Sequence, residues 1–509
     1  MWSFIVADVI IESSCRCLAS ILLTTYYQYP QPETMVKINN KVFRTTLSLQ
    51  TLAKQTLALL MSAMLLPAAS AQTTPADDNA VQWLQEFVRV DTINPPGNEF
   101  RAVEFYARIF DSYGIPYETA ESAPGRGNIW ARLEGGDDPG LILLQHTDVV
   151  PADREYWTFD PLSGELKDGY IYGRGTRDMK GLGIAQLVAF LNLHTSGQPL
   201  NRDVVFLATA DEEAGGEFGV GWLIDNHPGI FEDIGILLNE GGGGSRSSAG
   251  DVAFGVEVTQ KVPVWLHLKA VDVPGHGSSP RTTSSVTRIV QALNTLLENP
   301  FPPRIIPPVD DYFVALSETM NDEWASAYAD LNTAIQDPAF VQRLHEQRPG
   351  HNALIRDTCS MTRFEGSSKI NVIPPEAWAE LDCRILPDKP AEQFVAELES
   401  LIAHTGVTVD VIMAFTPAIS TTNSRLFEAI RNVTGELHPG SRVIPSVTTG
   451  FTDSHFTRDL GIISYGFNPM ITDDGEHTGV HGNDERVPEA AFKRGVSDFY
   501  AVIRNVVVD

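Results

Sequence analysis

The run Leu-Ile-Leu-Leu-Gln-His-Thr-Asp at 141–148 and the run Gly-Arg-Gly-Thr-Arg-Asp-Met-Lys-Gly at 173–181 organise this chain. The apolar start of the first run is typical of a strand that is buried on both faces of a parallel sheet. His146 and Asp148 follow that strand directly, and Asp178 lies in the second run. We therefore expect this stretch to supply two metal-binding residues, His146 and Asp178, and the rest of the chain to supply their partners.

Buried strands alternate with helices in the first half of the chain. Apolar runs at 141–144, 203–208 and 234–238 predict strands, and helical spacing predicts helices over 183–193 and from 220 onward. This alternation indicates an α/β layered catalytic domain with a mixed, largely parallel sheet. The chain has 509 residues, which is long for one domain, so a second domain is expected.

The pattern changes near Gln260 to strand–helix–strand–strand–helix–strand. The predicted elements lie at 262–270, 283–297, 353–364, 377–385, 390–404 and 407–412. This order is the plan of a ferredoxin-like α+β domain. We therefore expect a catalytic domain in two parts, 72–259 and 416–509, with a lid or dimerisation domain inserted at 260–415. A Pro-rich and helical stretch at about 298–350 would be an elaboration of the insert.

The formal net charge of the chain is −28 at pH 7. Nucleic acids and anionic membrane surfaces both bind basic faces, so the charge argues against either as a partner. A solvated acidic surface is the simplest interpretation of this charge.

Residues 1–71 have the features of a targeting segment. Basic residues precede an apolar run at 57–66, and Ala-Ser-Ala at 69–71 resembles a cleavage site. This predicts an upstream extension and a signal peptide, export to a periplasm, and no stable membrane association after cleavage. Met35 would be a natural start. An uncleaved membrane anchor is the alternative, although the apolar run is short for a bilayer span.

Cleavage near Ala71 would remove Cys15 and Cys17 and leave Cys359 and Cys383. If the two strands that contain the remaining cysteines form an antiparallel hairpin, the cysteines lie about opposite each other. In an oxidising compartment they could then form a cross-strand disulfide. The alternative is a pair of small buried thiols.

Acidic and imidazole side chains follow each of the three buried strands. They are His146 and Asp148 after the first strand, Asp211-Glu212-Glu213 after the second, and Glu240 after the third. Ligands bind at this edge of open α/β sheets, and carboxylates packed there repel one another unless a cation holds them. Imidazole and carboxylate donors without cysteine favour Zn²⁺ or a similar ion. Two ions about 3.5–4 Å apart would need one bridging carboxylate.

The chain resembles the family of co-catalytic zinc hydrolases that contains acetylornithine deacetylase, succinyl-diaminopimelate desuccinylase, aminoacylase, glutamate carboxypeptidase and carboxypeptidase S. The resemblance covers nearly all of residues 77–509. Its motifs, in chain order, are His146-Thr-Asp148, the run at 173–181, Asp211-Glu-Glu213, Glu240-Gly241, Gly275-His276-Gly-Ser-Ser-Pro280, Asn371-Val-Ile-Pro374, Asp382-Cys-Arg384, Thr452-Asp453 and His481-Gly-Asn-Asp-Glu-Arg486. Each motif alone is a weak signal, whereas their shared order is a strong one.

The resemblance implies two metal sites that share one carboxylate. His146, Asp178 and Glu240 would hold one ion, and Asp178, Glu213 and His481 would hold the other. Zn²⁺ is the expected metal, with Co²⁺ or Mn²⁺ as alternatives. Many relatives carry Asp at the position of Glu240, although aminoacylase-like members carry Glu.

Two other histidines compete with His481 for the C-terminal ligand position. His481 begins a run similar to the family's His-Gly-x-Asn-Glu pattern, whereas His477 lies in an acidic turn and has the features of a surface residue. His455 is expected near the site without binding metal.

The same resemblance implies catalytic roles for three further residues. Asp148 would fix the tautomer of His146, and Glu212 would be the general base that takes a proton from the attacking water. His276 would stabilise the oxyanion, in relatives often from the partner subunit of a dimer. A homodimer is therefore one expected assembly, although the elaboration at 298–350 could either make or block the dimer contact.

Asn371 and Arg384 are the expected substrate-binding residues. Arg384 is similar to a family residue that meets the substrate's carboxylate, for which a planar guanidinium is suited. A salt bridge at the strand end is the alternative for Arg384.

The implied function is hydrolysis of an amide bond next to a free carboxylate, as in a dipeptidase or carboxypeptidase. An N-acyl-amino-acid amidohydrolase with the same mechanism is the alternative, and a non-catalytic binding protein on the same fold is a remote one. The large insert resembles carboxypeptidase S, which favours a peptidase. A serine hydrolase is disfavoured, because Ser278 and Ser279 beside His276 lack a Gly-x-Ser-x-Gly elbow.

Overall fold

A computed structural model describes residues 75–318, 320 and 323–508. These residues lie within one compact unit, residues 73–509. The predicted extension and signal peptide, residues 1–71, lie outside the described residues. Within the described part of the chain, no helix is both long and apolar enough to cross a bilayer.

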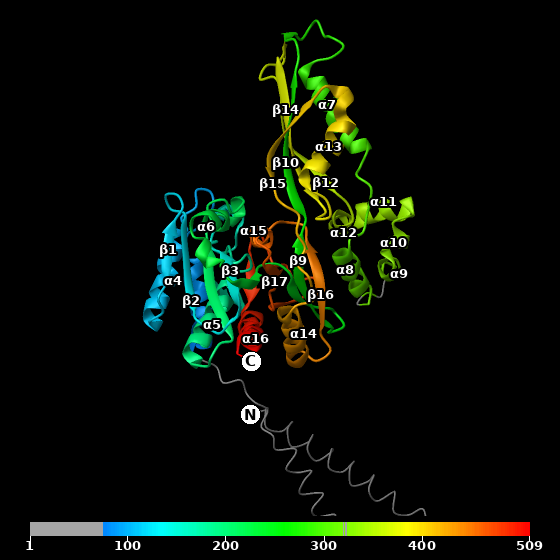
Figure 1. Cartoon of the computed structure of the whole chain (residues 1–509). Helices are drawn as coiled ribbons and strands as arrows, with labels where there is room; N and C mark the ends of the chain where they lie inside the picture. The colour runs from blue at the N-terminus through cyan, green and yellow to red at the C-terminus, as the bar shows by residue number, and fades with distance from the viewer. Residues whose placement is uncertain (1–74, 319, 321–322, 509) are drawn as a thin grey trace, which may run out of the picture. The chain divides into compact units, whose positions relative to one another are not determined.

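The first sheet is mixed and contains the strands that end at the predicted site (Figure 1). In spatial order its strands are β1 (Glu118–Glu121), β2 (Gly127–Leu133), β6 (Arg202–Thr209), β3 (Asp138–His146), β7 (Ile234–Asn239), β17 (Ile463–Gly466), β9 (Val252–Gln260), β8 (Gly243–Arg246) and β18 (Ile471–Asp473), and β16 (Arg442–Thr448) also pairs with β9. The strands β6, β3, β7 and β17 are parallel to one another, whereas β2 and β9 are antiparallel to their inner neighbours. The predicted α/β class is confirmed.

Alternate residues of β3 face two different hydrophobic cores. Leu141 and Leu143 lie in one core, and Ile142 and Leu144 lie in the other. The first core contains α3 (Pro75–Val88), α4 (Phe100–Tyr113), α5 (Lys180–Ser196), α14 (Arg425–Leu437) and α16 (Glu489–Val507), and the second contains α6 (Val220–Asn226). Because both faces of β3 are covered, its side chains must be apolar in succession, as the sequence indicated.

The second sheet has the order β12-β14-β10-β15. Its strands are β10 (Val262–Val271), β12 (Thr358–Glu365), β14 (Glu376–Ile385) and β15 (Thr408–Ala414), and residues of α7 (Ser285–Glu298) and α13 (Ala391–Ile402) pack in its core. Together these elements confirm the predicted ferredoxin-like plan. The chain enters the second sheet at Lys261, between β9 and β10. That 260–415 is a separate domain stays a prediction.

The elaboration of the second sheet is helical and has a small core of its own. Its helices are α8 (Pro307–Ser317), α9 (Ala325–Ala329), α10 (Leu331–Ala334), α11 (Pro338–Gln347) and α12 (Pro349–Leu354). One predicted boundary is wrong, because the strand expected from Ala353 begins only at Thr358. Pro349 starts α12 instead, in the first-turn position that proline favours.

Further short elements lie outside the two sheets, and some of them carry parts of the predicted site. They are η1 (Arg154–Tyr156), η2 (Glu212–Ala214), η3 (Pro228–Ile230), η4 (Ala403–Thr405), α15 (Ser454–Asp459), the three-stranded sheet of β4 (Glu165–Lys167), β5 (Tyr170–Tyr172) and β19 (Arg486–Pro488), and the pair β11 (Gly275–His276) and β13 (Val372–Ile373).

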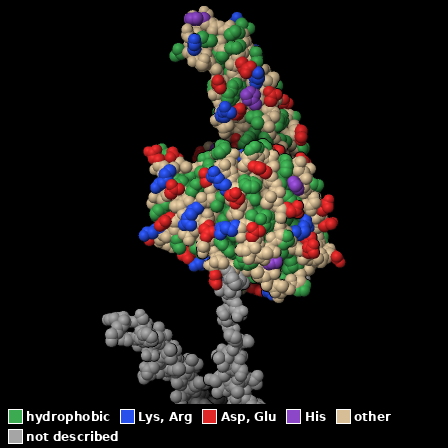
Figure 2. Space-filling model, turned by 90° about the vertical axis from the view of Figure 1, so that its left-hand side faces the viewer, with side chains coloured by type: hydrophobic (Ala, Val, Ile, Leu, Met, Phe, Trp, Pro, Cys, Tyr) green, Lys and Arg blue, Asp and Glu red, His purple; other side chains and the backbone are tan. Residues whose placement is uncertain are grey.

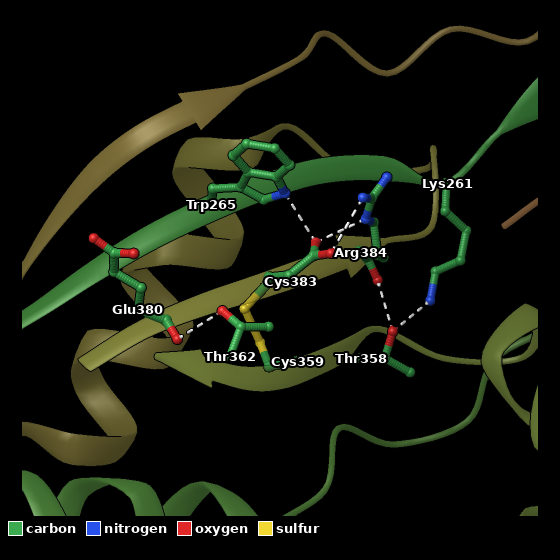
Figure 3. Close-up of a disulfide and its surroundings, with 9 residues drawn as sticks. Lys261, Trp265, Thr358, Cys359, Thr362, Glu380, Cys383 and Arg384 are labelled. Carbon is green, nitrogen blue, oxygen red and sulfur yellow. Dashed lines mark hydrogen bonds and ion pairs between the residues drawn. A yellow bond between two sulfur atoms is a disulfide. The ribbon is translucent and has the colours of Figure 1, made fainter. Parts of the chain in front are cut away.

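Cys359 and Cys383 form a disulfide between β12 and β14 (Figure 3). The two residues are partners in the antiparallel register, with their Cα atoms 4.0 Å apart. Cys383 is buried in the core of the second sheet. The predicted cross-strand disulfide is confirmed, and the alternative of two thiols is excluded.

Replacing both cysteines, Cys359→Ala with Cys383→Ala, should lower the free energy of unfolding by roughly 2–4 kcal/mol, because the bridge constrains the unfolded chain. Denaturant unfolding of the oxidised wild type, the reduced wild type and the variant measures this difference. The reduced wild type should match the variant. Equal stability of the oxidised and reduced wild type would contradict the prediction.

Candidate metal centre

The predicted ligands meet at the carboxyl ends of three adjacent parallel strands. His146 is the last residue of β3, Glu240 directly follows β7, and Glu213 lies in η2 just after β6. Asp178 precedes α5, and His481 lies in the loop before β19. Because parallel strands end at one edge of the sheet, residues far apart in sequence converge there.

The first set of ligands surrounds the Nε2 atom of His146. Nε2 lies 3.2 Å from Oδ1 of Asp178 and 3.6 Å from Oε2 of Glu240. The imidazole is buried, with 1% of its side chain exposed. These are the three residues expected to hold one ion.

The second set surrounds the Nε2 atom of His481. Nε2 lies 3.0 Å from Oδ2 of Asp178 and 3.2 Å from Oε2 of Glu213. His481 adopts a left-handed backbone conformation, with φ at 54°, which is uncommon for a residue other than glycine and typical of functional sites. Asp178 therefore presents one oxygen to each histidine, as a bridging carboxylate would.

The donor set fits divalent cations. Ligand atoms of His146, Asp178 and Glu213 lie within 4.8 Å of one another, and so do those of His146, Glu212 and Glu240. Among the described residues, Oε1 of Glu213 is buried without a hydrogen-bond partner. Two imidazoles and several carboxylates, with no thiolate, are donors that Zn²⁺ and similar ions accept.

Burial and the crowding of carboxylates shift the pKa values of several residues of the site. Burial, with the negative charge of Asp178, raises the pKa of Glu240 to about 7. Burial also raises the pKa of Glu212 well above its usual range, and Glu240 adds to the effect. Hydrogen bonds to Asp178 and Glu213 raise the pKa of His481 to about 10. Bound cations would displace these protons.

Asp148 positions both the His146 ring and the turn that carries Glu212 and Glu213. Its Oδ1 atom lies 3.3 Å from Nδ1 of His146. The same carboxylate accepts the backbone N–H groups of Glu212 at 3.2 Å and Glu213 at 3.1 Å, and the amide of Asn94 at 2.8 Å. The sequence predicted the contact with His146 but not the contacts with the turn.

Glu485 is a positioning residue to which the sequence analysis gave no role. Its buried carboxylate accepts the backbone N–H groups of Gly175, Arg177 and Asp178 at 3.1, 2.7 and 3.2 Å. It also accepts a hydrogen bond from the Arg174 guanidinium at 2.7 Å. Glu485 thus ties the loop of Asp178 to the loop of His481. Its position in the His481–Arg486 motif was the available signal.

The two competing histidines make other contacts. His477 Nε2 lies 3.3 Å from the carbonyl oxygen of Asn483. The ring of His455 stacks on Phe415, with centroids 3.6 Å apart, and lies tilted against Phe456, with centroids 3.8 Å apart; burial lowers its pKa to about 3. His481 is thus the one of these three histidines that lies beside Asp178 and Glu213, and its binding of metal stays a prediction.

His276 and Asn371 lie at the far end of the second sheet from the metal centre. Gly277, after β11, donates its N–H to the carbonyl of Asn371 at 2.9 Å. β10 has ten residues, so roughly 33 Å of strand lies between Lys261 and this end. Within one copy of the chain, these residues are not brought to the ligands. We call this end of the second sheet the tip.

Arg384 lies at the opposite end of the second sheet, where β14 pairs with the start of β10. Its Nε donates to Oδ1 of Asp382 at 2.7 Å and its Nη2 to Oδ2 at 3.2 Å (Figure 3). The guanidinium also lies over the Phe451 ring, 5.4 Å from the centroid. The salt bridge that was the alternative is therefore present, and substrate binding by Arg384 stays a prediction.

Asp178→Asn should abolish paired metal binding, because an amide cannot offer two anionic oxygens. Asp148→Asn should keep both ions but weaken their binding roughly 10- to 100-fold, as expected for a residue that orients a ligand. Elemental analysis and titration against a competing chelator measure both effects, with the exposed Asp168→Asn as the control. Two ions bound to Asp178→Asn at wild-type affinity would contradict the bridging role.

Metal affinity should rise with pH between 6 and 8. Glu240, with a pKa of about 7, is protonated below that pH, and His481, with a pKa of about 10, is protonated throughout the range. Each must lose its proton to bind metal. The proton on His481 alone changes the affinity about tenfold per pH unit, so we expect a loss of at least about 100-fold from pH 8 to pH 6 and net proton release. Calorimetry in buffers of different ionisation enthalpy measures both. An affinity that does not change with pH would refute this.

Known proteins resemble the chain along most of its length. An N-fatty-acyl-amino acid synthase/hydrolase PM20D1 from Xenopus tropicalis is 28% identical over 97% of this chain and 93% of its own. A probable carboxypeptidase S-like 2 from Dictyostelium discoideum is 29% identical over 74% of this chain and 73% of its own. The crystal structure of an M20 family metallo-carboxypeptidase from Sulfolobus solfataricus matches with a TM-score of 0.64 at 18% identity, covering 84% of this chain and 99% of its own, which shows a shared fold.

A family model also matches most of the chain. The sequence model of peptidase family M20/M25/M40 matches residues 142–505, which include every predicted ligand. The chain belongs to this family of peptidases and is a metal-dependent hydrolase.

Proposed function

We propose that the enzyme hydrolyses the amide bond of N-acyl amino acids, whose amine side carries a free carboxylate. The observation that carries the proposal is the pair of ligand sets sharing Asp178, with buried Glu212 beside them. The acyl-amino acid class is supported by the PM20D1 relative, whose name describes hydrolysis of such compounds. Short peptides, the substrates placed first from the sequence, are the second candidate and are supported by the carboxypeptidase S-like relative.

The proposed metals are two Zn²⁺ ions, with Co²⁺ or Mn²⁺ as alternatives. His146, Asp178 and Glu240 would hold one, and Asp178, Glu213 and His481 the other. Such ions act as Lewis acids that acidify water and polarise a carbonyl oxygen.

Glu212 is the proposed general base and acid. It takes a proton from the attacking water and returns it to the leaving nitrogen. Burial gives this carboxyl a raised pKa, which suits a group that must accept a proton near neutral pH.

Recognition of the substrate carboxylate is proposed for Arg384. Asp382 engages Nε and Nη2, whereas Nη1 is buried without a hydrogen-bond partner among the described residues. A guanidinium held in place by one carboxylate, with one nitrogen unpaired, suits a second carboxylate. Asn371, the other predicted substrate-binding residue, would contribute from the tip.

The proposed assembly is a homodimer in which the tip of one copy reaches the metal centre of the other. His276 would then stabilise the oxyanion of the partner's reaction. Apolar side chains are exposed around the tip, including Ile370, Val372 and Val273. Figure 2 shows hydrophobic and histidine side chains gathered at the free end of the narrow upper part.

Export, with a signal peptide that ends near Ala71, is also proposed. The disulfide between Cys359 and Cys383 supports an oxidising compartment such as a periplasm.

The metal-loaded enzyme should hydrolyse a panel of N-acyl amino acids. It should hydrolyse amides that have the same acyl groups but lack the free carboxylate more slowly, or not at all. Glu212→Gln should lower kcat by about 10²- to 10⁴-fold while both ions remain bound. Glu217→Gln, an exposed residue of the same loop, is the matched control and should keep wild-type activity. Release of the free amino acid measures the reaction. No cleavage of N-acyl amino acids would refute the proposed function.

His276→Ala and Glu212→Gln should each be nearly inactive, and a refolded mixture should regain about a quarter of wild-type activity. Half of the randomly mixed dimers are heterodimers, and each has one site with both residues intact. Activity of the mixture against each variant alone measures this complementation. A mixture that stays as inactive as its parts would contradict action of His276 across a dimer.

A further inference from the structure

The two histidines of the metal centre are oriented in different ways. Nδ1 of His146 lies 3.3 Å from Oδ1 of Asp148, so a carboxylate holds this ring at its second nitrogen. His481 faces Asp178 and Glu213 through Nε2, but among the described residues no hydrogen bond reaches its Nδ1 atom. A histidine that binds metal normally donates its second ring N–H to a fixed partner. His481 therefore lacks the device that orients His146.

Packing does not orient His481 either. Only 1% of the His146 side chain is exposed, whereas 54% of the His481 side chain is exposed. The direction of the His481 ring must then come from its backbone, which is left-handed at His481 and again at Asp484, with φ at 54° in both. Such a backbone is unfavourable in a residue other than glycine and persists only where surrounding contacts hold it. The loop of His481 therefore needs contacts that fix its path.

Asp484 is held by a residue from a distant part of the chain. Its Oδ1 atom accepts the backbone N–H of Thr158 at 2.7 Å, and its Oδ2 atom accepts the Thr158 hydroxyl at 2.8 Å. The two residues are 326 positions apart in sequence. Because both carboxylate oxygens are engaged, the Asp484 side chain is fixed three residues after His481. We call this pair of hydrogen bonds the clasp.

The segment that contains Thr158 is itself packed against the loops of the metal centre. Trp157 is buried, and the Arg174 guanidinium lies over its ring, 5.2 Å from the centroid. Nη2 of Arg174 donates to the carbonyl oxygen of Gly482, the residue after His481, at 2.7 Å. The contacts at Gly482 and Asp484 thus fix the backbone directly after His481 to one segment of the chain.

We propose that Asp484, held by Thr158, is a positioning residue for His481. The clasp holds the left-handed turn from which the imidazole reaches Asp178 and Glu213, and it replaces the ring hydrogen bond that His146 has. This inference rests on the proposed pair of metal sites. It makes the affinity for the ion at His481 depend on Thr158, a residue that is hydrogen-bonded to Asp484 and to none of the ligands.

Thr158→Val and Asp484→Gly test the clasp. Valine keeps the shape of threonine but lacks the hydroxyl, so one of the two hydrogen bonds is lost. Glycine removes the carboxylate and both bonds, yet it adopts a positive φ without strain, so a weaker site cannot be attributed to the backbone angle. Thr158→Ser keeps both bonds and is the conservative variant. Glu155→Gln, an exposed residue of the same segment, is the control.

The measurement is titration of the metal-free protein with Zn²⁺ against a competing chelator, and His481→Ala identifies the ion that is bound at His481. Asp484→Gly should weaken the binding of that ion roughly 10- to 100-fold, as expected for loss of a residue that orients a ligand. Thr158→Val should weaken it about two- to tenfold, the effect of one hydrogen bond. The affinity for the other ion should stay within about twofold of wild type in both variants. Thr158→Ser and Glu155→Gln should match the wild type.

Two results would overturn the positioning role and leave the proposed pair of sites standing. One is an Asp484→Gly variant that binds the ion at His481 as tightly as the wild type. The other is equal weakening of both ions, which would show that the clasp supports the fold as a whole. If Asp484→Gly does not fold, Thr158→Val decides between the same outcomes.

The His481→Ala variant separates failure of the clasp from failure of the metal sites. If this variant still binds two ions as tightly as the wild type, His481 is not a ligand. The proposed second site then fails, and the positioning role of Asp484 fails with it.

Discussion

The position of the Asp178 carboxylate between two imidazoles is the constraint on which the rest of the site depends. One oxygen faces His146 and the other faces His481, while Glu213 and Glu240 approach from the flanks. Burial, together with the negative charge of Asp178, raises the pKa of Glu240 to about 7. At neutral pH these buried carboxylates need protons or cations between them. Buried hydrogen bonds hold the surrounding loops in place.

Two carboxylates outside the ligand sets bring distant parts of the chain to this point. Asp148 joins the end of β3 to the turn after β6, and Glu485 joins the C-terminal loop to the loop before α5. Each accepts backbone N–H groups, so each fixes the path of a loop rather than a single side chain. The ligands can therefore come from positions as far apart in sequence as 146 and 481. Recognition of the substrate is proposed for other surfaces, namely Arg384 and the tip.

Most of the architecture, and the convergence of the expected ligands, could be predicted because the relevant signals are local or ordered in sequence. Leu141–Leu144 had to be a doubly covered strand, and the hairpin around Asn371 brought Cys359 opposite Cys383. The family motifs identified each expected ligand by its position in a motif. The hydrogen bonds that Glu485 accepts were not predicted, because the donors are backbone N–H groups whose direction depends on the folded loop.

Other features left no readable pattern in the sequence. The strand β8 consists of Gly, Gly, Ser and Arg, which has no apolar alternation, so this strand was not predicted. The distance of His276 from its expected site depends on the length and direction of β10, which periodicity alone does not give. A helix forms at Pro349–Leu354, where the predicted strand was expected to start, because proline is favoured in the first turn of a helix.

The central claim is that two ions share Asp178. Anomalous X-ray diffraction from crystals of the Zn²⁺-loaded protein, recorded on both sides of the zinc absorption edge, tests it most directly. The account predicts two peaks about 3.5–4 Å apart, one on each side of the Asp178 carboxylate, between His146 and His481. A single peak, or peaks that do not contact Asp178, would contradict it.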